Sequence, residues 1–123
     1  MISLTAGAGI AVGTESEATP VARLTVKEGF EVERLYSVPK AKYGSWVTLC
    51  KDDKGRFIAG DQYGSLYRFA PPAAGVALKD SDIEKIDLDI GHAWGLCYAF
   101  DALYVVVNDK AHGGRGLYRV RDT

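Results

Sequence analysis

The sequence predicts an all-β, antiparallel protein that comprises about two blades of a β-propeller. A repeat and a series of short alternating segments between turns indicate this fold. A β-rich unit that recurs at about 40 to 50 residues is typical of propeller blades, because one blade must stack on a neighbour to bury its faces. With a shift of 47 residues, Leu49 and Cys50 match Leu96 and Cys97, residues 56–61 match 103–108, and, after a four-residue insertion, 66–69 match 117–120.

The predicted strands follow one another along the chain. Alternation of apolar and polar residues over 30–38 predicts a leading strand that Pro39 ends. Gly55 and Gly64 lie in predicted turns, where we expect a positive φ. Residues 83–90 predict an outer strand, with a short helix as the alternative. The remaining strands are expected at 46–50, 56–61, 65–69, 95–100, 102–108 and 116–121.

The chain divides into a leader and one β-rich region. Residues 1–22 are interpreted as a mobile leader or the remnant of a secretory signal, which lacks the basic residues that normally precede the apolar segment. Residues 23–123 form the predicted partial propeller, with repeats at about 44–70 and 92–121. A closed propeller needs at least four blades, so we expect a fragment of a longer protein, partnered by its remaining blades or domains, or a chain that self-associates.

Composition narrows the partners and the chemistry. With 15 basic and 16 acidic residues the net charge is -1, which gives no field to attract nucleic acid or an anionic membrane. No apolar run reaches the 18 to 20 residues, roughly, that a membrane span needs. Cys50 and Cys97 occupy equivalent repeat positions, and we expect two buried free thiols. Two cysteines without a second pair argue against zinc, and no metal site is predicted.

Polar residues follow two equivalent predicted strands. Asp61, Gln62 and Tyr63 come after one strand, and Asn108 comes after its counterpart. Such residues would meet at one mouth of a propeller, so we interpret them as ligand-binding candidates. The alternative is that Asp61 and Asn108 cap turns, and the two roles are compatible. His92 is the catalytic candidate, because its ordinary pKa near 6.5 suits a general base; an imidazole bonded to backbone is the alternative.

Several segments resemble one known family of propellers. They are residues 26–39, 44–47, 60–68, 90–100 and 114–123. Together they are similar to the amino-terminal end of large bacterial proteins described as membrane-bound dehydrogenases or haem-binding-domain proteins. The resemblance covers roughly residues 26 to 123.

The resemblance implies an extracytoplasmic, dehydrogenase-like redox protein with a propeller similar to the glucose/sorbosone dehydrogenases. It implies a periplasmic location and, in the full-length family, a quinone cofactor or haem. This chain contains no Cys-x-x-Cys-His, so it has no site for covalent haem, and we expect it to be inactive alone. The enzymatic assignment rests on resemblance only. The alternative is a non-enzymatic propeller module that binds carbohydrate or protein.

Overall fold

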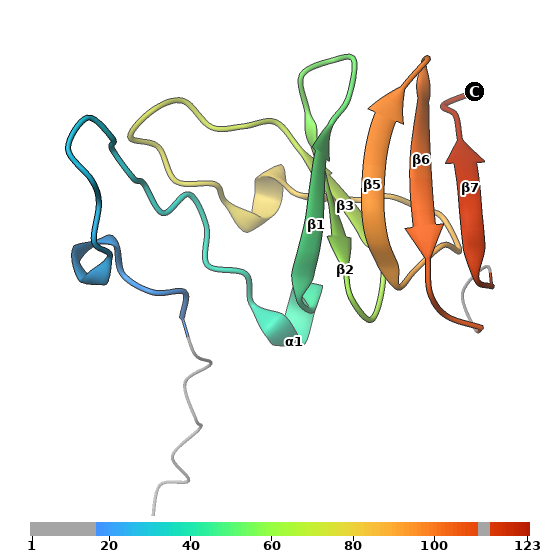
Figure 1. Ribbon diagram of the computed structural model, residues 1–123, viewed down its shortest axis with the longest axis horizontal. Helices are drawn as coiled ribbons and strands as arrows, with labels where there is room; N and C mark the ends of the chain where they lie inside the picture. Colours follow the sequence, from blue (N-terminus) through green and yellow to red (C-terminus); the bar gives the residue numbers. More distant parts are fainter. Residues whose placement is uncertain (1–16, 111–113) are drawn as a thin grey trace, which may run out of the picture.

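The computed structural model describes residues 17–110 and 114–123, and it contains two antiparallel sheets with very little helix (Figure 1). Sheet A has the order β1 (Trp46–Lys51), β2 (Phe57–Asp61), β3 (Leu66–Phe69) and β4 (Glu84–Lys85). Sheet B has the order β5 (Ala93–Ala99), β6 (Ala102–Val107) and β7 (Gly116–Val120). Short helical turns occur at η1 (Val21–Arg23), α1 (Lys40–Tyr43) and η2 (Asp80–Asp82). The all-β, antiparallel prediction is therefore confirmed.

The strand registers show which positions of the two sheets correspond. In sheet A, Ala59 lies between Leu49 and Tyr67. In sheet B, Val105 lies between Leu96 and Tyr118. We call the face that carries Ala59 or Val105 the front face of its sheet, and the opposite face the back face. The back face carries Leu66 in sheet A and, at the corresponding position, Leu117 in sheet B.

The two sheets stack front to back. The main core joins Ile58 and Leu66 on the back face of sheet A to Leu103, Val105 and Val107 on the front face of sheet B. Leu66 and Val105 are both buried completely or nearly so, at 1% and 0% exposure. Both sheets therefore face the same way, as successive layers of one repeating stack.

The register also corrects the repeat by one residue. Asp61 pairs with Trp46, and the residue that pairs with the corresponding Ala93 is Val107. The predicted equivalence of Asp61 and Asn108 is therefore wrong, and Asn108 lies one position beyond it. The cause is the turn between the first two strands of each sheet. Three residues, 53–55, link the Asp52–Arg56 pair, whereas two, Phe100 and Asp101, link Ala99 to Ala102.

Two predicted strands form only in part or not at all. Residues 30–38 belong to no strand, although their backbone runs along sheet A and the Leu78 amide donates to the Leu35 carbonyl at 2.8 Å. An alternating pattern predicts an extended backbone, but it does not specify which strand will pair with it. Among the described residues, no strand pairs with residues 30–38. Of residues 83–90, only Glu84 and Lys85 pair, against Arg68 and Tyr67.

The leading segment covers the front face of sheet A. Its residue Tyr36 packs with Trp46 against a second core of Ala59, Phe69 and Leu78. Hydrogen bonds hold it there, since the Tyr36 hydroxyl and the Lys42 ammonium both donate to Asp80. The back face of sheet B has no such cover among the described residues. Cys97 is accordingly exposed, so its predicted burial is wrong, whereas Cys50 is half-buried between the sheets; both thiols are free.

Candidate functional site

The predicted site residues gather at one end of the stack, where β2 and β6 end and β5 begins (the lower end in Figure 1). The His92 amide donates to the Gly64 carbonyl at 3.1 Å. The Asn108 amide in turn donates to the His92 carbonyl at 3.4 Å. His92 therefore links the turn that follows Asp61 to the segment that follows β6. Asp61, His92 and Asn108 accordingly lie at the same end of the stack.

Asp61 organises the turn between β2 and β3. It is 6% exposed, and its Oδ1 accepts hydrogen bonds from the backbone amides of Ser45 (2.8 Å) and Tyr63 (3.1 Å). Gly44 and Gly64 pack directly on the carboxylate, because a Cβ at either would lie 2.2 or 2.5 Å from Oδ2. The structure thus places Asp61 as the turn cap that the sequence offered as one alternative.

The charge of Asp61 also reaches the aromatic core. Burial, and next the nearby Asp61 charge, raise the pKa of the Tyr67 hydroxyl above its usual value. The tyrosine therefore stays neutral across the physiological range. Because its carboxylate accepts hydrogen bonds from the Ser45 and Tyr63 amides, Asp61 has a structural role and helps to position Gln62 and Tyr63, the two residues that follow it.

Those neighbours differ in exposure. The Gln62 amide donates to the Ser45 carbonyl at 2.8 Å, and the residue is half-buried. Tyr63 is 61% exposed, and its ring meets the His92 imidazole edge to face at 6.4 Å between centroids. Of the three residues predicted after β2, Tyr63 is therefore the one whose side chain is most exposed to solvent.

His92 is held in an unusual backbone conformation beside a carboxylate. Its φ is 53°, in the left-handed region that non-glycine residues seldom occupy. Its Nδ1 lies 3.2 Å from Oδ2 of Asp109, and the two side chains are 25% and 23% exposed. A carboxylate at Nδ1 orients the ring and stabilises a proton on that nitrogen. An imidazole oriented in this way can exchange a proton with a ligand hydroxyl.

Asp109 is the residue that the sequence reasoning missed. It follows Asn108 directly, so its position after β6 was a signal that could have identified it. Asn108 itself is exposed. Residues 111–113, which follow shortly after Asp109, lie outside the described part of the chain, as do residues 1–16 of the leader.

A polar hollow of about 360 Å³ adjoins this end, lined by Tyr63 together with residues 85–91. Charged groups at Lys85, Asp87 and Asp89 surround it, which suits a hydroxyl-rich ligand better than an apolar one. Within residues 17–110 and 114–123, no group of three or more acidic, histidine or cysteine side chains is placed to hold a metal ion.

Comparison with protein-family models, with curated proteins and with solved structures yields no significant match to this chain. In the described ranges, no helix has the length and apolar character needed to cross a membrane. The assignment of function therefore depends on the geometry above and on the sequence resemblance.

Proposed function

We propose that the chain supplies two neighbouring blades of a β-propeller in an extracytoplasmic, dehydrogenase-like redox protein, as a fragment that is inactive alone. The observation that carries the architectural part is the front-to-back stack of two sheets with corresponding residues at corresponding positions. Such a stack leaves the back face of sheet B ready for another layer of the same kind. Continued addition of layers around an axis is how a propeller is built.

The ligand-binding part of the proposal rests on the end of the stack that carries His92. Here Tyr63 offers an exposed ring, Asn108 an exposed amide, and the His92–Asp109 pair a proton acceptor. Asp109 acts through His92 as a positioning residue. In a redox protein that oxidises alcohols, the imidazole would remove the hydroxyl proton of the substrate.

These residues do not by themselves fit a quinone cofactor or a haem. Among the described residues at this end, the exposed ring of Tyr63 borders an open polar hollow, and the His92 imidazole meets that ring without lining the hollow. A cofactor of that size needs contacts on most of its surface. In this proposal, the remaining blades of the longer protein supply those contacts. The whole protein is placed in the periplasm.

Ligand titration followed by NMR tests the site. Glucose, sorbose and pyrroloquinoline quinone are added separately to the isotopically labelled chain. We expect weak binding, with dissociation constants of about 1 mM or higher because most contacts are missing. Shifts should centre on residues 61–65, 92 and 108–110 and should shrink in His92→Ala. Shifts centred on Tyr98 at the opposite end would contradict the proposed site.

A hollow at that opposite end favours the second candidate, a non-enzymatic module that binds carbohydrate or protein. It has a volume of about 550 Å³ and lies between the sheets, bordered by Arg56, Arg68, Asp87, Tyr98 and Asp122 among others. Alternating acidic and basic groups beside an aromatic ring can bind sugar hydroxyls. The same titration separates the candidates, because glycan-induced shifts near Tyr98 without any near His92 would favour this second function.

A further inference from the structure

A four-residue pattern occurs twice in the chain, once inside a sheet and once outside. Val32-Glu33-Arg34-Leu35 and Ile83-Glu84-Lys85-Ile86 share the order apolar, glutamate, basic, apolar. They are 51 residues apart, the same shift that relates β3 to β7. The second copy contains β4, whereas the first belongs to no strand. The first copy, residues 32–35, therefore has a sequence typical of a fourth strand but is not paired with any sheet.

The contacts of β4 show what such a strand needs. Glu84 lies opposite Arg68 of β3, and its carboxylate accepts hydrogen bonds from Nε at 3.0 Å and from Nη2 at 2.8 Å. This bidentate pair fixes the register of the outermost strand, since two parallel hydrogen bonds specify geometry as well as sign of charge.

Sheet B offers the matching edge. It has three strands. Arg119 of β7 corresponds to Arg68 of β3, since each directly follows the tyrosine, Tyr118 or Tyr67, that pairs with Val105 or Ala59. Arg119 is exposed. The back face beside it is apolar and open, with Leu117 at 69% exposure where the corresponding Leu66 has 1%. Within the described part of the chain, both the edge and the face thus lack the cover that sheet A has.

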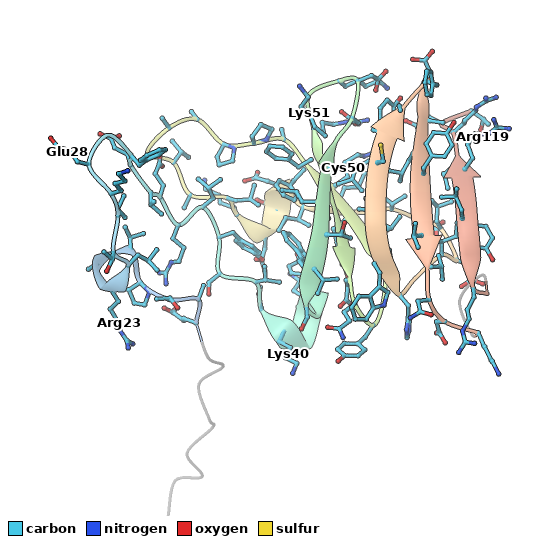
Figure 2. All side chains as sticks on the ribbon, viewed as in Figure 1. Arg23, Glu28, Lys40, Cys50, Lys51 and Arg119 are labelled. Atoms are coloured by element: carbon cyan, nitrogen blue, oxygen red, sulfur yellow. The ribbon has the colours of Figure 1, made fainter. Side chains whose placement is uncertain are left out.

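The segment and the edge cannot meet within one chain. Figure 2 shows Arg119 at one end of the long axis and Glu28, close in sequence to the segment, at the other. Residues 32–35 are themselves exposed. The Gly75 amide donates to Glu33 at 2.9 Å and the Leu78 amide to Leu35 at 2.8 Å, while Arg34 donates to the Ala18 carbonyl at 2.8 Å and lies 3.6 Å from the Glu17 carboxylate. Rearrangement of exposed contacts of this kind costs little free energy.

We propose that residues 32–35 of one copy of this chain form the fourth strand of sheet B in a second copy, with Glu33 opposite Arg119. In the same movement, the back face of that sheet B enters the hollow between the front face of sheet A and the leading segment. This inference rests on the proposed stacking of sheets, and it is independent of any redox chemistry.

The hollow has the chemistry that this docking requires. Its volume is about 410 Å³, and apolar side chains that include Val32, Leu35, Trp46, Leu49 and Phe57 line it. The layer that would enter it presents Val106 and Leu117, which are 46% and 69% exposed. Two copies that dock reciprocally bring four sheets together, the smallest number of blades in known propellers, so the head-to-tail contact can close at a dimer.

Sedimentation and light scattering of the full chain across micromolar concentrations test the proposal. We expect a dimer. Arg119→Glu and Glu33→Arg should each raise the dimer dissociation constant about tenfold or more by placing like charges opposite each other. The double variant Arg119→Glu/Glu33→Arg should recover most of that loss. Arg23→Glu and Glu28→Arg, which change charge at other exposed positions near the segment, are the matched controls and should have little effect.

Alkylation of Cys97 gives a second measurement that does not depend on charge. Cys97 lies on the open back face of sheet B, so its reaction with iodoacetamide should slow at concentrations where the dimer forms, and this protection should vanish in Arg119→Glu. Cys50 is the internal reference, because burial, and next the nearby Cys97 and Asp52, raise the pKa of its thiol to about 11.

A chain that stays monomeric, or a dimer that neither substitution weakens, would overturn the proposal. So would a double variant as weak as the sum of the single ones, provided that circular dichroism shows each variant to be folded. Loss of ligand binding at His92 with the dimer intact would instead count against the proposed function alone, and the two failures are thus distinguishable.

Discussion

Individual residues in this chain are constrained by two different physical requirements that the sequence does not separate. Gly55 has a φ of +75° with open space around it, so its requirement is conformational. Gly64 was also expected to take a positive φ, and that prediction is wrong. Its requirement is spatial, because a side chain there would meet the Asp61 carboxylate. A glycine in the sequence can therefore indicate a turn, but it does not show whether a positive φ or a close contact requires glycine at that position.

A double-mutant cycle separates the two requirements. Gly55→Ala and Gly64→Ala should each lower the free energy of unfolding by about 1 to 3 kcal/mol, the first through strain and the second through the clash. In an Asp61→Ala background, the cost of Gly64→Ala should fall sharply, whereas the cost of Gly55→Ala should not change. Urea denaturation measures all of these values. Equal costs for Gly64→Ala in both backgrounds would show that the carboxylate is not the obstacle.

Asp52 gives the protein a predictable sensitivity to acid. Burial alone would raise its pKa, but hydrogen bonds from the backbone and guanidinium of Arg56 outweigh it and hold the pKa below its usual value. Because the folded pKa is below the unfolded one of about 4, the stabilisation is complete above about pH 5 and is lost as the pH falls through the folded pKa. Asp52→Asn should therefore be less stable than the natural chain at pH 7 and lose less stability between pH 5 and pH 3.

Thermal unfolding at several pH values checks this expectation. Asp87→Asn, which removes an exposed carboxylate, is the matched control and should keep the acid sensitivity of the natural chain. If Asp52→Asn and the natural chain lose stability in parallel over this range, the Arg56 contact does not set the acid response.

At the level of elements, the strands inside each meander could be predicted and the isolated ones could not. Alternation and turn residues located all three strands of each repeat to within two residues, because hairpin partners are close in sequence. Residues 30–38 have the same alternation but no hairpin partner. Their pairing depends on a distant edge, which no local pattern specifies. The one-residue slip between repeats likewise came from a turn length that alignment without a gap could not detect.

The same limit applies to the candidate site. Strand ends predicted that Asp61, His92 and Asn108 would share one end, because successive strands of a meander alternate in direction. Side-chain roles were harder to predict. The pairing of His92 with Asp109 depends on a backbone conformation with positive φ that the sequence Gly91-His92 does not reveal.

The β5–β6 turn should respond to redesign of its two central residues. Phe100 and Asp101 have φ values of 51° and 56°, which is the pattern of a type I′ turn and favours Asn-Gly. The double substitution Phe100→Asn/Asp101→Gly should therefore raise the free energy of unfolding by about 1 kcal/mol. Lys54→Asn in the other hairpin, where φ is not positive, should bring no comparable gain. A loss of stability in the redesigned turn would show that the Phe100 side chain contributes packing there.

At the scale of the whole molecule, polar groups of the described residues converge at one end of the stack, beside a hollow that is open to solvent. In the proposed propeller, the two sheets of one chain would border only a fraction of the central axis. Precise positioning of substrate by many contacts accounts for a large part of enzymatic rate enhancement, and most of those contacts are lacking among the described residues. Binding groups and catalytic competence therefore need not coincide in this chain.

We accordingly expect no measurable dehydrogenase activity from the purified chain, assayed at concentrations where it is monomeric, with common sugars, quinone cofactor and an artificial electron acceptor. Dye reduction followed spectrophotometrically is the measurement, with a complete sugar dehydrogenase as the positive control. Turnover that disappears in His92→Ala and persists in Lys79→Ala, a surface substitution distant in sequence, would establish a self-sufficient site and refute this expectation.

The glycine at position 60 has a consequence for symmetry. A Cβ there would lie 2.7 Å from Cγ2 of Thr48 in the same sheet and 3.3 Å from Cβ of Ala93 in sheet B, so a larger residue would crowd both sheet A and its junction with sheet B. The corresponding residue of sheet B is Val106, whose bulk would hold any further layer farther away. Narrow and wide junctions would then alternate around a ring of two chains. Such a ring would have twofold rather than fourfold symmetry, with unequal rotation from one sheet to the next.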